Sequence, residues 1–254
     1  MAYRIAISGK GGVGKTTFAA LVVRHLARER RRPVLAVDAD PNATLGSLLG
    51  VEVEASVADI REETLEKKNA IPAGMSKDRF IELRIQQCIV EEHGFDLLTM
   101  GRPEGPGCYC FVNNLLRRYL ERAAADYPYV VIDNEAGMEH LSRRTDSSVD
   151  LLFIVTEPTV IGAATAGRIA NLATSLPIAV KRMAIVVNRV GDQGMAEAVR
   201  AKLAEAGPPV VGELPFDQIV LDASMNGTSV LDLPGDSPML VAVREILEAQ
   251  LATP

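Results

Sequence analysis

The chain has 254 residues, of which 48% are hydrophobic and 24% charged, and its formal net charge is −6. This length and apolar content suit one α/β domain, and the acidic balance argues against a broad surface for nucleic-acid backbones. The 3 cysteines are too few for a disulfide framework. No apolar run approaches the ~18 residues of a membrane span, and a strand-like run starts too early for a signal peptide. We therefore expect a cytoplasmic protein that binds neither nucleic acid nor membrane.

The first predicted element is a strand over residues 3–7, which leads into a glycine-rich loop and then a helical pattern from residue 18. The loop matches G-x-x-x-x-G-K-T. In this order of strand, loop and helix, backbone N–H groups point at phosphate oxygens and the helix start adds the positive end of its dipole. Lys15 would reach the terminal phosphates, and the Thr16 hydroxyl would bind magnesium. The predicted phosphate-binding residues are Gly11, Gly12, Val13, Gly14, Lys15, Thr16 and Thr17.

A second lysine, Lys10, stands at the mouth of this loop, although a phosphate loop needs only one. Taken alone, Lys10 fits a solvated side chain. The run from Lys10 to Thr17 resembles the deviant Walker A motif of the MinD, ParA and nitrogenase iron-protein superfamily of P-loop NTPases. The resemblance implies that Lys10 crosses a dimer interface to the partner's nucleotide, that Lys10 acts in catalysis beside Lys15, and that the chain forms a homodimer when ATP is bound.

Six further apolar runs follow, at residues 34–37, 95–100, 129–132, 151–155, 183–187 and 210–214, with helical periodicity in most gaps between them. This alternation predicts an α/β fold with a mostly parallel sheet of about seven to eight strands and helices on both faces. We expect a single ATPase domain over residues 1–254, with a charged helical insertion at residues 51–92 that contains Cys88 as a core thiol. Apolar positions from Met239 to Leu251 predict a C-terminal helix docked on the core.

Acidic residues follow two of the predicted strands. Asp38 and Asp40 end the run at 34–37, and Asp133 ends the run at 129–132, just before Glu135, Ala136 and Gly137. Each aspartate alone fits a turn or cap residue, but beside a phosphate loop such carboxylates can hold magnesium-bound waters or orient an attacking water. These segments resemble switch I and switch II of the superfamily. The resemblance implies that Asp40 activates the hydrolytic water and that Asp38 and Asp133 lie in the outer shell of magnesium.

The nucleotide base is expected to be adenine. Asn188 and Arg189 follow a strand, where a base-reading asparagine is expected, but the Asn-Lys-x-Asp arrangement that grips guanine is absent. The later segment from Leu214 to Asp217, with Pro215, resembles the superfamily segment that lies along the adenine edge through its backbone. ATP, hydrolysed to ADP and phosphate, is therefore the expected substrate.

Two cysteines, Cys108 and Cys110, lie in a segment of glycines and proline that we take as a metal-binding loop over residues 101–114. In an extended segment, side chains two apart fall on the same side, so both sulfurs can meet one ion. Two thiolates make half of a four-ligand site, and a two-fold axis would supply the rest from the partner. The alternative is that both are small buried hydrophobes. His25, His93 and His140 lie apart and fit packing or surface residues better than ligands.

The stretch from Gly101 to Cys110, the run from Asn113 to Arg117 and the run from Asp133 to His140 resemble the CooC-type maturation ATPases. Members of that family assist nickel insertion into the active-site cluster of carbon monoxide dehydrogenase, and related members serve acetyl-CoA synthase. The resemblance implies that the Cys-x-Cys pairs of two subunits bind one nickel or zinc ion per dimer. Neither the identity of the ion nor the client follows from the residues.

Two rival functions remain at this point. A nitrogenase iron-protein-like reductase would need a cysteine just after switch II, where the sequence has Met138, Glu139 and His140. A ParA-like or MinD-like positioning ATPase would use ATP to control attachment to DNA or membrane, which the acidic charge and the acidic C-terminal helix disfavour.

Overall fold

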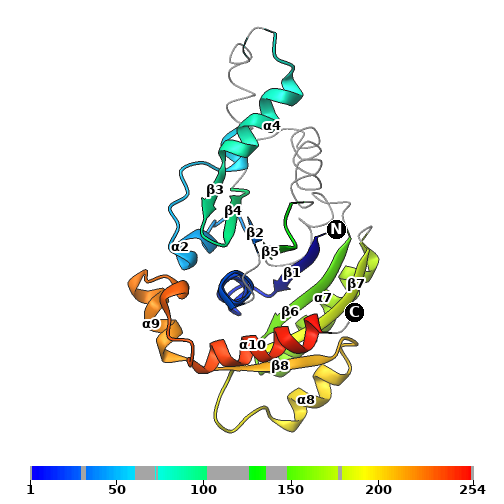
Figure 1. Cartoon of the computed structure of the whole chain (residues 1–254). Coiled ribbons are helices and arrows are strands. Elements are labelled where there is room, and N and C mark those ends of the chain that lie inside the picture. The colour runs from blue at the N-terminus through cyan, green and yellow to red at the C-terminus, as the bar shows by residue number, and fades with distance from the viewer. Residues whose placement is uncertain are drawn as a thin grey trace.

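The computed structural model describes residues 2–29, 33–60, 72, 74–101, 126–135, 148–176 and 179–252. Its centre is an eight-stranded sheet with the order β3-β4-β2-β5-β1-β6-β7-β8 (Figure 1). Neighbouring strands are parallel, except that β3 runs antiparallel to β4. The strands are β1 (Tyr3–Gly9), β2 (Val34–Ala39), β3 (Ile89–Glu92), β4 (Phe95–Thr99), β5 (Tyr129–Asn134), β6 (Val149–Thr156), β7 (Val180–Val190) and β8 (Val210–Pro215). The predicted fold class is confirmed.

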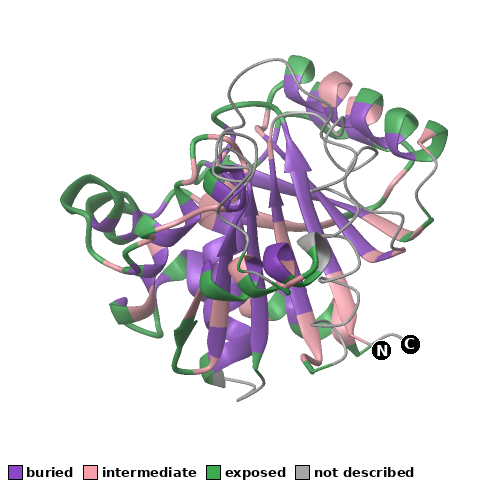
Figure 2. Ribbon diagram, turned by 90° about the horizontal axis from the view of Figure 1, so that it is seen from above, coloured by how far each residue is buried: buried purple, intermediate pink, exposed green. Residues whose placement is uncertain are grey.

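Helices cover both faces of the sheet because the central strands are apolar on both sides. Ile5 and Ile7 of β1 pack into a core cluster with α1 and α10, whereas Ala6 packs into a second cluster with α7 and α8. A third cluster joins β2 and β4 to α4. The helices are α1 (Lys15–Arg24), the π-helix η1 (His25–Glu29), α2 (Leu45–Leu49), α4 (Lys77–Gln87), α7 (Val160–Ser175), α8 (Glu197–Ala204), α9 (Gln218–Asn226), the 3-10 turn η2 (Val230–Asp232) and α10 (Pro238–Leu251). Figure 2 shows the buried residues gathered in the strands and on the inward sides of the helices.

One part of the expected insertion is not helical. Helix α4 ends at Gln87, and Ile89–Glu92 form the edge strand β3, in which Ile89 pairs with Leu98 of β4. The helical prediction for these last residues is therefore wrong. The strand is short, half exposed and acidic, so it carries no apolar alternation, and pairing with β4 decides its conformation. Cys88, at the end of α4, is buried as expected of a core thiol.

The C-terminal helix docks as predicted. Met239, Val243 and Leu247 of α10 are buried in the same cluster as Phe18 of α1. Phe18 also packs edge to face on Phe153 of β6, with ring centroids 5.2 Å apart. These contacts fix α1 against the middle of the sheet, and α1 is the helix that follows the glycine-rich loop.

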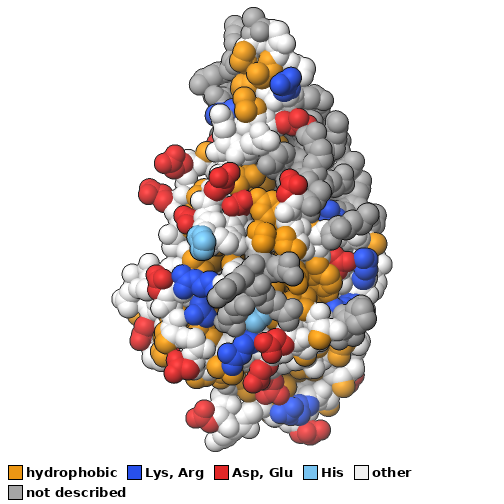
Figure 3. Space-filling model, viewed as in Figure 1, with side chains coloured by type: hydrophobic (Ala, Val, Ile, Leu, Met, Phe, Trp, Pro, Cys, Tyr) orange, Lys and Arg blue, Asp and Glu red, His pale blue; other side chains and the backbone are white. Residues whose placement is uncertain are grey.

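The strand order places a crevice at the carboxyl end of β1. The chain leaves β1 for α1 and continues at β2 on one side of the sheet, while β6 pairs with β1 on the other side. A reversal of this kind leaves the loops above β1 apart, and ligands of open α/β sheets bind there. Within the described residues, no helix is long and apolar enough to cross a membrane. On the face seen in Figure 3, acidic and basic side chains are intermixed.

Candidate functional site

The glycine-rich loop adopts a conformation that only glycine accepts easily. Gly12 has a φ of 80° and Gly14 a φ of 91°, both in the left-handed region, and α1 begins at the next residue, Lys15. A Cβ atom on Gly14 would lie 2.4 Å from Nδ2 of Asn188. That same Nδ2 donates a hydrogen bond of 2.8 Å to the carbonyl oxygen of Val13. The loop is thus held from β7, and its shape forms a cradle for an anion at the start of α1.

The two lysines of the loop lie in different environments. Lys15 is buried, and its Nζ lies 3.4 Å from the carbonyl oxygen of Lys10, to which it donates a hydrogen bond. Lys10 is exposed at the mouth of the loop. Lys15 is therefore folded inside its own loop, whereas the charge of Lys10 faces outward. This geometry agrees with separate tasks for the two lysines.

Asp38 holds the loop that follows β2. It is fully buried, and its two carboxylate oxygens accept hydrogen bonds from the backbone N–H groups of Asp40, at 3.1 Å, and Leu45, at 2.8 Å. Burial raises the pKa of Asp38 to about 6, although these two bonds act to lower it. Asp38 therefore connects the end of β2 to the start of α2 and fixes the loop between them.

Asp133 is a buried carboxylate whose hydrogen-bonding capacity is not satisfied by the described residues. Its exposed fraction is 0%, and neither of its oxygens makes a hydrogen bond of normal geometry within the described residues. Burial raises the pKa of Asp133 to about 7; the nearby charge of Asp38 adds to the increase, while the Thr16 hydroxyl and the Lys15 charge act against it. Residue pairing in the sheet puts Asp133 beside Asp38. An unsatisfied carboxylate at this depth is costly to the fold and calls for a cation.

Asp40 lies at the edge of the same site and is more accessible. Its Oδ1 accepts hydrogen bonds from the backbone N–H of Asn42, at 2.9 Å, and from Nδ2 of Asn42, at 2.8 Å. Ala43, the next residue, has a φ of 51° and is strained. The turn therefore fixes the Asp40 carboxylate, which lines the cavity together with Lys15.

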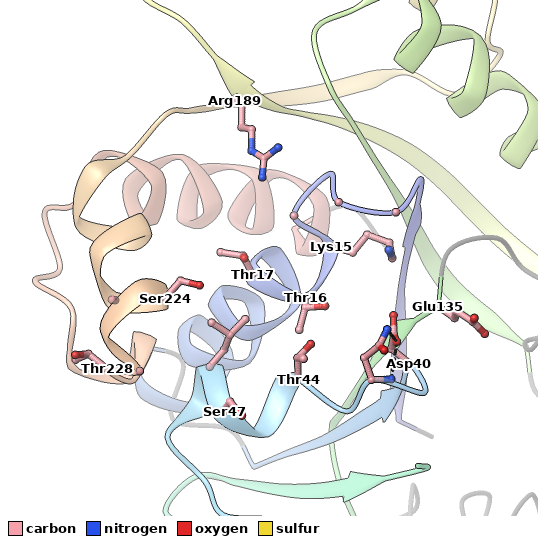
Figure 4. A pocket seen from close by; sticks show the side chains of 17 residues that line it. Lys15, Thr16, Thr17, Asp40, Thr44, Ser47, Glu135, Arg189, Ser224 and Thr228 are labelled. Carbon is pink, nitrogen blue, oxygen red and sulfur yellow. Dashed lines mark hydrogen bonds between the residues drawn. The ribbon is translucent and has the colours of Figure 1, made fainter. Parts of the chain in front are cut away.

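These residues surround a cavity of about 600 Å³. Figure 4 shows Asp40 and Glu135 on one side of it, Ser224 and Thr228 on the other, and Lys15 and Thr16 between them. The lining residues are Gly11, Gly12, Gly14, Lys15, Thr16, Thr17, Asp40, Asn42, Thr44, Ser47, Leu48, Glu135, Arg189, Ala223, Ser224, Gly227 and Thr228. The cavity thus has an acidic end and an end lined by hydroxyl groups.

The residues present fit a magnesium-bound nucleoside triphosphate. The glycine cradle and Lys15 suit phosphate oxygens, and the unsatisfied carboxylate of Asp133, next to Asp38 and the Thr16 hydroxyl, suits the shell of a divalent cation. The cavity volume is in the range of small-molecule sites. Most of the predicted phosphate-binding residues and Asp40 line the cavity itself, whereas Asp38 and Asp133 lie beneath it.

The residues predicted to read the base are only partly on the cavity wall. Arg189 lines it, but Asn188 is buried and its amide holds the Val13 carbonyl and the backbone N–H of Arg189. Asp217 caps α9 and also accepts hydrogen bonds from Ser237 Oγ and, at 3.0 Å, from the N–H of Met239. Neither Pro215 nor Asp217 lines the cavity, so contact of this segment with a base through its backbone stays a prediction.

Several wall residues carry no motif that could have revealed them from the sequence. Thr44 and Ser47 lie at the start of α2, Ser224 lies in the last turn of α9, and Thr228 follows that helix. The two helices are far apart in the chain, and they come together on this cavity because both pack into the same core cluster as α1. The one available signal was their nearness in sequence to Asp40 and to the Pro215 segment.

The two cysteines of the predicted metal-binding loop are not among the residues that the structure describes. Cys108, Cys110, Ala136, Gly137 and His140 lie beyond the described residues. The described part of the chain reaches Gly101, and the N–H of Met100 donates a hydrogen bond of 2.8 Å to the carbonyl oxygen of Asp38. Among the described residues, no group of three or more His, Cys, Asp or Glu side chains is placed to hold a metal ion. Met100, the residue just before the segment that carries both cysteines, is thus bonded to a residue of the candidate magnesium site.

Comparison with known proteins adds four findings. The family model described as CobQ/CobB/MinD/ParA nucleotide binding domain matches residues 5–230. An uncharacterized ATP-binding protein of Methanocaldococcus jannaschii is 43% identical over 96% of each chain. The carbon monoxide dehydrogenase accessory protein CooC of Rhodospirillum rubrum is 34% identical over 91% of this chain and 90% of its own. The structure of MinD from Pyrococcus horikoshii with Mg-ADP aligns with a TM-score of 0.71 at 22% identity, over 100% of this chain and 98% of that one.

Proposed function

Because the chain belongs to the CobQ/CobB/MinD/ParA nucleotide-binding family, and is therefore a P-loop ATPase, we propose that it is a dimeric maturation factor that uses ATP to assist nickel insertion into carbon monoxide dehydrogenase. The observation that carries the proposal is the Cys108 and Cys110 pair, which has no task in a positioning ATPase. The likeness to the accessory protein of Rhodospirillum rubrum along nearly the whole chain supports it. Acetyl-CoA synthase is an alternative client, and zinc is an alternative ion.

The proposed hydrolytic cycle begins at the glycine loop. On nucleotide binding, Lys15 moves its Nζ from the Lys10 carbonyl to the terminal phosphates, and the loop N–H groups hold the phosphate oxygens. Magnesium, when bound, neutralises charge on the phosphates, and Thr16, Asp38 and Asp133 are the residues that would hold it. Asp40, fixed by its turn with Asn42, orients the attacking water. Lys10 of the partner adds positive charge as the phosphate leaves.

The proposed coupling to metal runs through Asp38. The carboxylate of this residue holds switch I through the N–H groups of Asp40 and Leu45, and its carbonyl accepts the N–H of Met100, where the chain enters the cysteine-bearing segment. A displacement of Asp38 would therefore act both on switch I and on Met100, the residue that precedes the cysteine-bearing segment. In the proposal, closure of two subunits on ATP assembles four thiolates around one ion, and opening after hydrolysis releases it.

Sedimentation with metal analysis tests the proposal, with and without a non-hydrolysable ATP analogue. We expect about one nickel or zinc ion per two chains, held by the dimer. Cys108→Ala should lose the ion and keep ATP hydrolysis within a few-fold of the parent. Cys88→Ala is the matched control, because Cys88 is a buried core thiol and its loss should leave the metal in place. One ion per isolated chain, or unchanged metal content in Cys108→Ala, would contradict the shared site.

The client is tested separately. Nickel-free carbon monoxide dehydrogenase, mixed with nickel, ATP and this protein, should regain activity faster than with nickel alone, and Cys108→Ala should give no acceleration. Equal rates with and without the protein would exclude this client. Pelleting with DNA or with anionic liposomes in the presence of ATP examines the positioning function, which requires ATP-dependent co-sedimentation.

A further inference from the structure

Arg189 is a strained residue that lines the cavity, away from its acidic end. Its φ is 60°, in the left-handed region that residues with a side chain seldom occupy. Strand β7 shifts its register against β8 between Val187 and Val190, so Arg189 lies in the irregular part of the strand. Glycine would adopt this conformation without strain. Strain of this kind persists where surrounding contacts enforce it, and it is concentrated at functional sites.

Two neighbours determine where Arg189 points. The Oδ1 atom of Asn188 accepts the backbone N–H of Arg189 at 2.8 Å, and the same amide is bonded to the Val13 carbonyl, so the backbone is tied to the glycine loop. At the other end of the side chain, Nη1 of Arg189 lies 3.4 Å from Oε1 of Glu157, just after β6. Figure 4 shows the guanidinium hanging over the P-loop helix, away from Asp40 and Glu135.

The phosphates and the nucleoside of a bound ATP must occupy opposite parts of the cavity. The glycine loop, Lys15 and the acidic end would fix the terminal phosphates, so the nucleoside would lie away from the acidic end, where Arg189 and Ser224 also line the cavity. A guanidinium is planar and stacks on aromatic faces. Less side-chain freedom is lost on binding when a partner already holds its plane. The side chains of Arg189 and Glu157 are 52% and 33% exposed, and an ion pair so exposed contributes little to stability. The ion pair matters instead because it sets the orientation of the Arg189 guanidinium.

We propose that Glu157 is a positioning residue that holds the Arg189 guanidinium against the base of bound ATP. The proposal rests on ATP binding and is independent of the metal and the client. Glu157 is outside the cavity lining, so in this proposal it acts through Arg189. The strained backbone of Arg189 and the carboxylate of Glu157 together direct the guanidinium toward the nucleoside. The phosphates are bound by the glycine loop.

Calorimetric titration with ATP and with inorganic tripolyphosphate tests this inference. Glu157→Ala should weaken ATP binding about fivefold and leave tripolyphosphate binding within about twofold, because the phosphates keep all their contacts. In steady-state hydrolysis, KM should rise with the Kd for ATP while kcat changes by less than about twofold. Glu157→Gln, which keeps an oxygen acceptor, should recover part of the loss. Equal weakening of ATP and tripolyphosphate, or no weakening of ATP, would overturn the proposal.

A second variant separates positioning from a structural role. Arg189→Gly should weaken ATP binding at least about tenfold and raise the thermal unfolding midpoint of the nucleotide-free protein, because it removes the strain. In that background, Glu157→Ala should have no further effect on ATP binding; a persistent effect would show that Glu157 acts without Arg189 and would overturn the proposal.

The matched control removes a similar ion pair elsewhere. Arg200 and Glu213 are 3.3 Å apart, with side chains 49% and 34% exposed, and neither lines the cavity. Glu213→Ala should leave both titrations unchanged. A loss of ATP affinity equal to that of Glu157→Ala would show a general effect of surface charge and would overturn the assignment.

Discussion

Replacing Asp133 by asparagine should stabilise the nucleotide-free protein and abolish magnesium-dependent hydrolysis. Asp133 is fully buried, and its oxygens make no hydrogen bond of normal geometry within the described residues. Its pKa rises from 3.8 to about 7, chiefly because burial disfavours the charged form. In the unfolded chain the same carboxyl ionises near its ordinary pKa, so ionisation in the folded state costs stability between about pH 4 and pH 7.

The magnitude follows from that difference. A shift of about three pKa units corresponds to about 4 kcal/mol of lost stability once the group is ionised in both states. Asparagine removes the charge but buries an amide whose hydrogen bonds are incomplete, at a cost of about 1 to 3 kcal/mol. We therefore expect Asp133→Asn to be more stable than the parent by about 1 to 3 kcal/mol at pH 8, and to show no advantage at pH 5.

Urea unfolding at pH 5, 6, 7 and 8, in the presence of a chelator, measures this difference. The advantage of Asp133→Asn should grow with pH, whereas Asp192→Asn, at an exposed position in the loop before α8, should track the parent throughout. Magnesium with ATP should stabilise the parent and have much less effect on Asp133→Asn. A constant stability difference across the pH range, or a variant less stable than the parent at pH 8, would refute the argument from burial.

The other predictions concern Gly14 and Lys10 of the glycine-rich loop and Asp217, which caps α9. Gly14→Ala should abolish ATP binding measured by calorimetry, since its Cβ would lie 2.4 Å from Asn188 Nδ2 and its φ is 91°; retained affinity would mean that β7 yields easily. Lys10→Ala should bind ATP within a few-fold of the parent but hydrolyse it at least about tenfold more slowly, as turnover assays can show. Asp217→Ala should cost about 2 to 4 kcal/mol in urea unfolding at pH 7. Burial acts to raise the pKa of Asp217, but hydrogen bonds, led by that of Ser237, lower it overall. The contribution of this carboxylate to stability is therefore present above its ordinary pKa and is lost as the pH falls below that value.

The sequence determined the glycine loop, the order of elements and the ends of the strands that carry Asp38, Asp40 and Asp133. These are local properties: glycine adopts the left-handed φ values of Gly12 and Gly14 without strain, and long apolar runs that alternate with helices form a parallel sheet. The Cys108 and Cys110 pair and its proposed half-site were also evident from sequence, and they remain a prediction.

Only the tertiary structure decided which side chains share a wall and what each one is bonded to. The strand over Ile89–Glu92 exists because β4 offers it a partner, and Asp217 and Asn188 lie beneath the surface because α10 and the glycine loop claim their hydrogen bonds. The raised pKa of Asp133 and the pairing of Arg189 with Glu157 likewise depend on burial and on contacts between distant parts of the chain. Periodicity and motif spacing describe neighbours along the chain, whereas desolvation and hydrogen bonding are set by neighbours in space.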